Sequence, residues 1–191
     1  MKKIIIACLL PLLILILSVT PVFGTSQMEI SGVYEMKAAP GDFSQKWDNN
    51  AYGIKMRFAT RGDWKNNLGL TFCYCQYSAQ AVTPTFPGDL TLGLPLRKDL
   101  TAFSLGISQK STFGKIDDLI HPYVKGEFGV AQMSTGNIQK KTHGYIGLGL
   151  GLSLNLNTDF RFFLESGFVL GLNNGIHDKM IPLHLGIAIN R

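Results

Sequence analysis

Residues 145–156 read Tyr-Ile-Gly-Leu-Gly-Leu-Gly-Leu-Ser-Leu-Asn-Leu, and the rest of the chain repeats the alternation of this stretch. Every even position from Ile146 to Leu156 carries a bulky aliphatic side chain, and the odd positions between them carry glycine, serine or asparagine. Because successive side chains of a strand point to opposite faces, the stretch predicts a β-strand with one aliphatic face and one small or polar face. A helix would spread the leucines around its circumference and would carry three glycines at a cost of about 1 kcal/mol each.

The two faces of this strand indicate which solvent surrounds it. Six aliphatic side chains in alternation exceed what a half-buried strand needs, and the small residues opposite them cannot build an ordinary core. An apolar outer face with a small or polar inner face is typical of a transmembrane β-barrel strand, whose outer face contacts lipid. A strand of a soluble sandwich can show the same alternation, so this strand alone leaves both folds open.

The N-terminus has the composition of a secretory signal peptide. Met1-Lys2-Lys3 is a short positive region, residues 4–19 are almost entirely apolar, and Val22-Phe23-Gly24 places a small residue where a signal peptidase cleaves. The apolar run is about 16 residues long and is interrupted by Pro11, whereas a membrane-spanning helix needs roughly 20 residues. We therefore expect a signal peptide over residues 1–24, a single barrel domain over residues 25–191, and no anchoring helix.

Charge and cysteine content exclude several classes of protein. Removing Lys2 and Lys3 from the 18 basic residues leaves 16, against 13 acidic residues, and a net charge of +3 is too mild to predict a nucleic-acid partner. Cys73 and Cys75 lie at i and i+2 of one predicted strand, where they share a face but cannot easily form a disulfide with each other. No second Cys/His pair has a metal-binding spacing, so small inward-facing side chains are favoured over a metal pair, and no cofactor is expected.

The alternation of the leucine–glycine stretch recurs along the chain after residue 24. Eight segments show it: residues 28–37, 52–59, 68–75, 102–108, 123–131, 145–156, 160–171 and 183–191. Each is near the 9–11 residues that a tilted membrane strand needs, and an even number of antiparallel strands can close on itself. Closure matters because an open sheet in lipid leaves backbone groups unpaired. The fold predicted is all-β, an eight-stranded antiparallel up-and-down transmembrane β-barrel.

The inner face of the predicted barrel is charged. Nine residues carry this charge, five basic and four acidic: Glu29, Glu35, Lys37, Lys55, Arg57, Lys125, Glu127, Arg161 and Glu165. An eight-stranded barrel is just wide enough for side chains to fill, and an unpaired buried charge is very costly. The pattern therefore favours a plug of salt bridges over the alternative, the lining of a small-solute pore. A soluble barrel of lipocalin type is the alternative fold, but it needs an apolar interior.

The links between the predicted strands are unequal in length. Residues 41–50 and 81–100 are predicted to be long outer loops, whereas residues 110–118 and 157–159 are predicted turns on the side of the N-terminus, the periplasmic side. Loops on a rigid scaffold commonly carry binding. Aromatic and basic side chains there suit a host surface, lipopolysaccharide phosphates or another envelope protein, with interfacial aromatics and solvated charges as the alternative. The candidate contacts are Phe43, Trp47, Phe86, Arg97 and Lys98.

No residue pattern indicates catalysis. His143 and His177 fall at predicted strand ends or loops, His121 begins a predicted strand, and only His184 is placed on an inner face. Ser153 and Ser166 have no spacing to a histidine or acid that recommends either as a nucleophile. We expect a protein that is not an enzyme, with a lipid-modifying barrel enzyme using a Ser/His/acid set as the alternative.

The residues His121-Pro122-Tyr123-Val124-Lys125-Gly126-Glu127-Phe128-Gly129, together with the leucine–glycine strand and the signal peptide, resemble the small eight-stranded outer-membrane barrels of the OmpA/OmpX or opacity-porin type. The resemblance covers essentially the whole chain after residue 24. It implies a bacterial outer-membrane protein that contacts lipid, lipopolysaccharide and the barrel-assembly machinery, with a structural, adhesive or weakly pore-forming role. Such barrels usually end in an aromatic residue, whereas this sequence ends Ile189-Asn190-Arg191. We expect a monomer.

Overall fold

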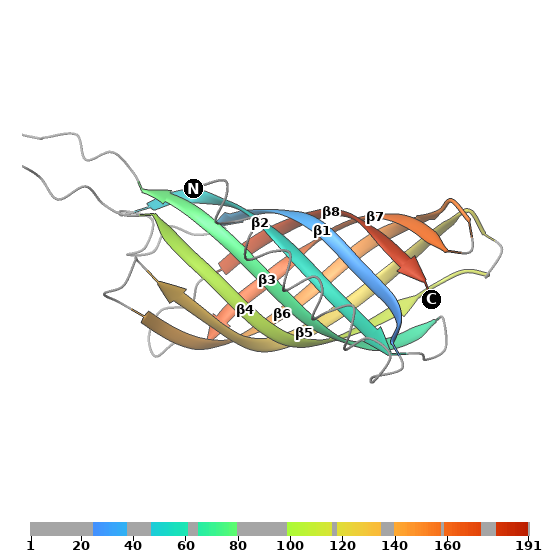
Figure 1. Ribbon diagram of the computed structural model, residues 1–191, viewed down its shortest axis with the longest axis horizontal. Helices are drawn as coiled ribbons and strands as arrows, with labels where there is room; N and C mark the ends of the chain where they lie inside the picture. Colours follow the sequence, from blue (N-terminus) through green and yellow to red (C-terminus); the bar gives the residue numbers. More distant parts are fainter. Residues whose placement is uncertain are drawn as a thin grey trace, which may run out of the picture.

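The computed structural model describes residues 25–37, 47–60, 65–79, 99–115, 118–134, 140–157, 159–172 and 179–190. These residues form one closed barrel of eight strands, in which each strand pairs antiparallel with its neighbours in the sequence and β1 pairs with β8 (Figure 1). The strands are β1 (Thr25–Lys37), β2 (Trp47–Thr60), β3 (Asn66–Ala79), β4 (Leu100–Thr112), β5 (Ile120–Ser134), β6 (Lys140–Asn155), β7 (Phe160–Leu172) and β8 (Lys179–Asn190). The predicted all-β, eight-stranded antiparallel barrel is confirmed.

The alternation seen in the sequence becomes the two faces of the barrel wall. On β6, Leu148 and Leu150 are 71% and 68% exposed, whereas Tyr145 and Ser153 on the opposite face are buried. The same parity holds on the neighbouring strands, because their registers place outward residues beside outward residues, as in the pair Leu148 and Phe168. Among the described residues, no helix is long and apolar enough to cross a membrane. The predicted signal peptide, residues 1–24, lies outside the described residues.

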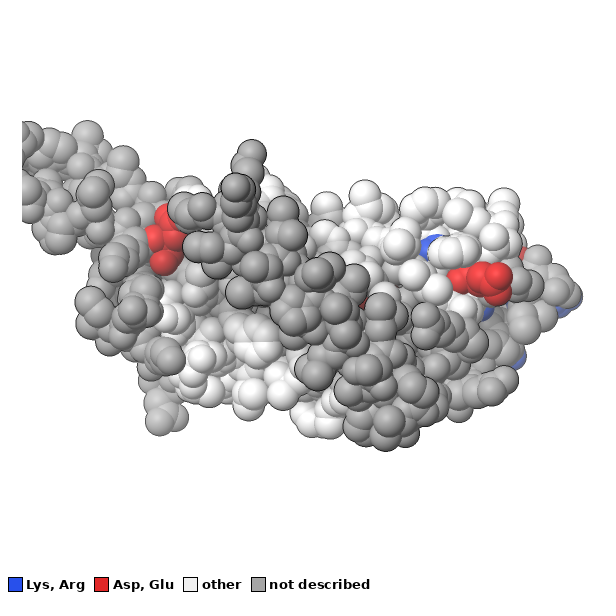
Figure 2. Space-filling model, viewed as in Figure 1, with Lys and Arg blue, Asp and Glu red and all other residues white. Residues whose placement is uncertain are grey.

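The outer wall is an apolar belt to which all eight strands contribute. Large hydrophobic side chains are exposed around the barrel, including Tyr52, Leu70, Phe128, Leu148 and Leu185. In Figure 2 the described surface is mostly free of charged residues, and its larger charged patches lie towards the two ends of the molecule. Soluble monomers rarely expose a contiguous apolar surface of more than a few hundred Å², so a belt around the whole barrel indicates contact with lipid.

Small residues on the inner face make room for large neighbours. A Cβ atom added at Gly151 would lie 2.3 Å from Cζ of Tyr123, a side chain that is 1% exposed. A Cβ atom added at Gly53 would lie 2.6 Å from Sγ of Cys75. The glycines of the inner face therefore accommodate the rings and sulfurs that neighbouring strands project across the narrow interior.

The two ends of the barrel differ in the sequence that joins the strands. At one end, here the turn end, β6 is joined to β7 by residues 156–159 and β4 to β5 by residues 113–119. At the other end, here the loop end, β1 is joined to β2 by residues 38–46 and β3 to β4 by residues 80–99. The first residue of β1 lies at the turn end, as the sequence predicts.

The strands are longer than the sequence analysis predicted, with 12 residues in β8 and 16 in β6. Trp47, predicted to lie on the first outer loop, is instead the first residue of β2. Lys110, predicted to begin a turn, lies inside β4, which continues to Thr112. The error has a physical cause: hydrogen-bonded strands continue beyond the apolar belt, where polar side chains keep the alternation but no longer look like a membrane segment.

Candidate functional site

The interior of the barrel is the candidate site, and charged groups follow one another along it from the turn end to the loop end. Nearest the turn end, the carboxylate of Glu29 accepts hydrogen bonds at Oε1 from Lys110 Nζ at 2.8 Å and from Arg57 Nη1 at 3.4 Å. Arg57 is 2% exposed, and its remaining donors reach Ser108 Oγ at 2.7 Å and the side-chain oxygen of Asn67 at 2.5 Å. Every charge in this group therefore has a partner.

Further along, Glu165 of β7 forms an ion pair with Lys125 of β5. The second oxygen of its carboxylate, Oε2, accepts a hydrogen bond from the hydroxyl of Tyr123 at 3.0 Å. Nε2 of His184 lies 4.0 Å from Oε1 of Glu165. The ammonium of Lys110 stands 3.9 Å from the centre of the Tyr123 ring, so this ring links the Glu165 group to the group at the turn end.

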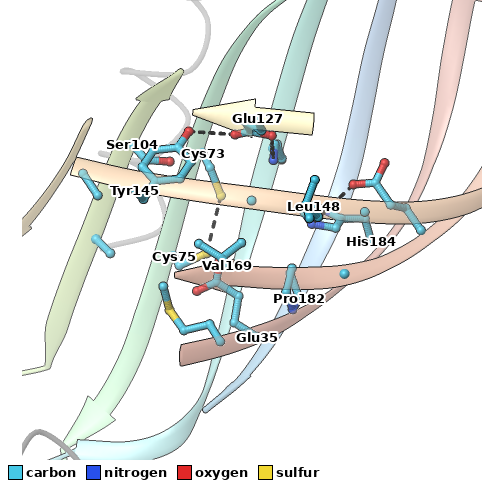
Figure 3. Close-up of a pocket in the computed structure, with 18 of the residues that line it drawn as sticks. Glu35, Cys73, Cys75, Ser104, Glu127, Tyr145, Leu148, Val169, Pro182 and His184 are labelled. Atoms are coloured by element: carbon cyan, nitrogen blue, oxygen red, sulfur yellow. Dashed lines mark hydrogen bonds and ion pairs between the residues drawn. The ribbon is translucent and has the colours of Figure 1, made fainter. Parts of the chain in front are cut away.

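At mid-depth, Glu127 joins three strands besides its own. Its Oε2 lies 2.5 Å from Nζ of Lys55, and its Oε1 accepts hydrogen bonds from the hydroxyls of Thr71 at 3.0 Å and Tyr145 at 2.7 Å. Figure 3 shows the bond between Tyr145 and Glu127 beside the cavity described below. A buried carboxylate with a cation and two hydroxyl donors has its desolvation offset by full hydrogen bonding.

Towards the loop end the interior holds a cavity of about 60 Å³. Glu35 lines it, and its Oε2 accepts a hydrogen bond from the hydroxyl of Tyr77 at 2.7 Å. Cys73, Cys75 and Met180 line the same space. The barrel is thus packed with paired charges towards the turn end and hollow towards the loop end.

The structure thus brings together six of the nine charged residues that the sequence places inside, in the pairs Glu29–Arg57, Lys55–Glu127 and Lys125–Glu165. Glu35 is bound by Tyr77 instead. Arg161 is half-buried near the turn end, and no ion pair joins it to another residue in the described ranges. Lys37 ends β1, and its side chain lies outside the described residues.

The candidate surface contacts are placed less completely. Phe43, Phe86, Arg97 and Lys98 lie outside the described residues, and Trp47 belongs to β2 with its side chain also outside the description. Whether these residues contact a ligand stays a prediction.

Sequence reasoning missed several residues of the interior. Lys110, which holds Glu29, is the clearest case, and a signal for it was present: Ser104, Gly106, Ser108 and Lys110 continue one parity of small or polar residues along β4. The hydroxyl donors Thr71, Tyr123 and Tyr145 were also missed, because their inward direction follows from parity but their partners do not.

The histidines need a correction as well. His121 and His143 are buried on the inner face of the barrel, as His184 is, because β5 begins at Ile120 and β6 at Lys140, earlier than predicted. Nε2 of His121 lies 2.7 Å from Nδ2 of the Asn155 side chain. The hydroxyl of Ser153 donates to the main-chain oxygen of His121 at 3.3 Å. Ser166, in contrast, is exposed on the outer wall.

Comparison with known proteins finds no matching family model and no matching curated sequence. Solved structures do match. Neisserial surface protein A superposes with a TM-score of 0.59 at 13% identity, over 86% of this chain and 96% of that one. Ail of Yersinia pestis, the attachment invasion locus protein, superposes with a TM-score of 0.52 at 14% identity, over 88% and 99%.

A third solved structure, the outer-membrane enzyme PagL, superposes with a TM-score of 0.53 at 14% identity, over 85% of this chain and 99% of that chain. One of these similar proteins is therefore an enzyme, and the other two are not described as enzymes. The structural similarity thus establishes the fold of this chain and does not decide whether it has an activity. The chain has the fold of the small eight-stranded outer-membrane β-barrels.

Proposed function

We propose that this protein is a non-enzymatic, monomeric barrel of the bacterial outer membrane, whose interior is a structural plug and whose loop end presents a binding surface. The pairing of the interior charges is the observation that carries the proposal. Lipid and lipopolysaccharide are the partners of the apolar belt in this proposal, and the barrel-assembly machinery is the partner during insertion. Recovery of the protein from the soluble periplasm without detergent would contradict the membrane location.

The plug is favoured over a small-solute pore by the size and content of the interior. The cavity of about 60 Å³ has room for a few water molecules. Between it and the turn end stand Arg57 and Tyr123, which are 2% and 1% exposed, held by the contacts described above. An open channel is a property of barrels with many more strands.

We expect no steady single-channel current from the purified protein in a planar lipid bilayer, because hydrated ions have no continuous path past Arg57 and Tyr123. Lys55→Ala serves as a control for contamination, since Lys55 lines the cavity. A wild-type current whose ion selectivity changes in Lys55→Ala would come from this barrel and would contradict the plug. A current that is identical in both proteins would come from a contaminating porin.

The surroundings of Ser153, a serine on the inner face, support a non-enzymatic role. The hydroxyl of Ser153 donates to a main-chain oxygen, and the nearby imidazole of His121 contacts Asn155. A serine nucleophile needs an imidazole or another base within hydrogen-bond reach of its hydroxyl. Ser166 faces lipid, on the opposite side of the wall from His184 and Glu165.

Binding at the loop end is supported by the length of the link over residues 80–99 and by the basic pair Arg97 and Lys98 within it. Among the similar structures, Ail was also crystallised with the heparin analogue sucrose octasulfate. Basic side chains that bind an anion form charge-assisted hydrogen bonds. A polyanionic surface glycan or lipopolysaccharide phosphate is therefore the ligand class that we propose for this loop.

Replacing Arg97 and Lys98 together by alanine should weaken retention on an immobilised sulfated glycan about 100-fold or more, since two charged hydrogen bonds are lost and each costs about 1.5–3 kcal/mol. Replacing Lys65 and Lys115 together by alanine is the matched control, because both are exposed at the opposite end of the barrel. An equal loss in this second double variant would show that binding follows net charge alone. Unchanged retention in the double variant, and after deletion of residues 84–96, would exclude this loop as the binding element.

A further inference from the structure

Three metal-ligating side chains converge at the hollow, loop-end part of the interior. Cys73 and Cys75 of β3 are 9% and 2% exposed and are free thiols. Glu35 reaches them from β1, and the two sulfur atoms and a carboxylate oxygen all lie within 4.8 Å of one another. Figure 3 shows the two cysteines and Glu35 side by side at the edge of the cavity. Neither the sequence spacing nor the proposed function accounts for this cluster.

The two sulfur atoms stand at the separation that a shared metal ion requires. They lie 3.6 Å apart, far beyond the roughly 2.05 Å of a disulfide, and two cysteines at i and i+2 of a strand cannot approach to that distance without distorting it. Two bonds of about 2.3 Å from one tetrahedral zinc ion place their sulfurs about 3.8 Å apart. The observed geometry therefore resembles one edge of a tetrahedral thiolate site.

The carboxylate of Glu35 is held in place by a second contact. The hydroxyl of Tyr77, a residue with no exposed surface, donates to Oε2 at 2.7 Å, and the hydroxyl oxygen also lies 3.3 Å from Sδ of Met180. Tyr77 thereby orients the carboxylate beside the two thiols. Partners of this kind orient a metal-ligating carboxylate. Gly53 completes the arrangement, because any larger residue there would collide with Sγ of Cys75.

We propose that Glu35, Cys73 and Cys75 bind a thiolate-preferring divalent cation of the zinc class inside the barrel. Water from the adjoining cavity completes the coordination, because the cavity is large enough to hold it. Two sulfur ligands favour zinc, cadmium or cobalt(II) over magnesium or calcium, which prefer oxygen. Each thiol loses its proton as its sulfur binds, so loading releases protons and weakens as the pH falls. This site does not depend on the proposed binding at the loops.

Cobalt(II) is the probe, added to the folded protein in detergent under a reductant that does not bind metals. We expect one equivalent to bind, with thiolate-to-cobalt charge-transfer absorption and the intense visible bands of a tetrahedral site. Zinc should displace the cobalt and magnesium should not. The absence of thiolate-to-cobalt absorption from the folded wild-type protein would overturn the proposal.

The variants identify the ligands. Cys73→Ser and Cys75→Ser should each weaken cobalt binding at least about 100-fold, the upper end of the loss caused by removing an outer-sphere partner alone. Tyr77→Phe should weaken it about tenfold, because Glu35 loses its orienting bond. Ser104→Ala is the matched control, since Ser104 lines the same cavity and should leave binding unchanged. Charge-transfer absorption that persists in the double serine variant would overturn the proposal.

Zinc should also raise the unfolding temperature of the wild-type protein, because it binds the folded state, and should leave that of Cys75→Ser unchanged. Should the serine variants fail to fold, X-ray absorption at the zinc edge of the loaded wild-type protein replaces them. Two sulfur neighbours support the site, and a shell of nitrogen and oxygen alone overturns it.

Discussion

Replacing Glu165 by alanine should lower the free energy of unfolding of the barrel by about 3–5 kcal/mol, the cost of breaking a buried ion pair by removing one partner. The variant leaves the ammonium of Lys125, a side chain that is 6% exposed, without its carboxylate. It also removes the acceptor of the Tyr123 hydroxyl. The narrow interior offers no neighbouring carboxylate that is not already bonded within the described residues, because Glu29 and Glu127 have cations of their own.

The measurement is urea-induced unfolding from lipid vesicles, followed by tryptophan fluorescence and by the shift of the folded band on an unheated gel. The matched control is the double variant Glu165→Leu with Lys125→Met, which removes both charges at similar volume and should lose much less stability than the single variant. Equal losses in the two proteins would show that the lost ion pair and hydrogen bond, and not an uncompensated charge, determine the cost. No loss in Glu165→Ala would show that water reaches Lys125.

Replacing Leu148 by arginine should destabilise the barrel by about 2–4 kcal/mol in a bilayer, as charged residues do on the lipid face of barrels at mid-membrane depth. Leu148 is 71% exposed and lies in the middle of β6, and its register neighbours Gly126 and Phe168 hold no counter-charge. In water the same substitution on an exposed side chain would be neutral. The size of the loss of stability therefore shows whether lipid or water surrounds the belt.

Leu156→Arg is the control for depth. Leu156 directly follows the last residue of β6, at the turn end, and is 55% exposed, so an arginine there should cost only about 0–1 kcal/mol near the interface. Folding into vesicles of defined lipid, titrated with urea, gives both values. Similar costs at the two positions would contradict a hydrocarbon belt centred on the middle of β6.

The strands and their faces could be predicted from the sequence because lipid requires only one property of a side chain. Along β6 and β7 every outward residue from Ile146 to Leu154 and from Phe160 to Leu164 is apolar, and parity alone then assigns the inward residues. The strand ends could not be predicted in the same way. Lys110 and Trp47 lie where the apolar belt has ended but the backbone ladder continues.

The partners inside the barrel could not be predicted either. Parity places Glu29 and Lys110 on the inner face, but their contact spans 81 positions of the sequence and crosses the barrel. Glu35 lies opposite Ala51 and Cys75 lies opposite Gly53, so the approach of Glu35 to Cys75 depends on the register of β1 with β2 and of β2 with β3. Register and closure are properties of the whole sheet, and spacing within one strand does not contain them.

The pairing of β1 with β8 has a consequence for how the barrel enters a membrane. The seam between β1 and β8 runs from Gln27 opposite Asn190 to Lys37 opposite Met180. The backbone groups on this edge of β1 therefore have no hydrogen-bond partners until β8 pairs with them. A barrel that lacked β8 would expose the unpaired backbone groups of β1 and β7 to hydrocarbon, and each unsatisfied group costs several kcal/mol. Half-inserted states are therefore too costly to accumulate. We therefore expect insertion to be cooperative over the eight strands, with the pairing of β8 to β1 as its last step.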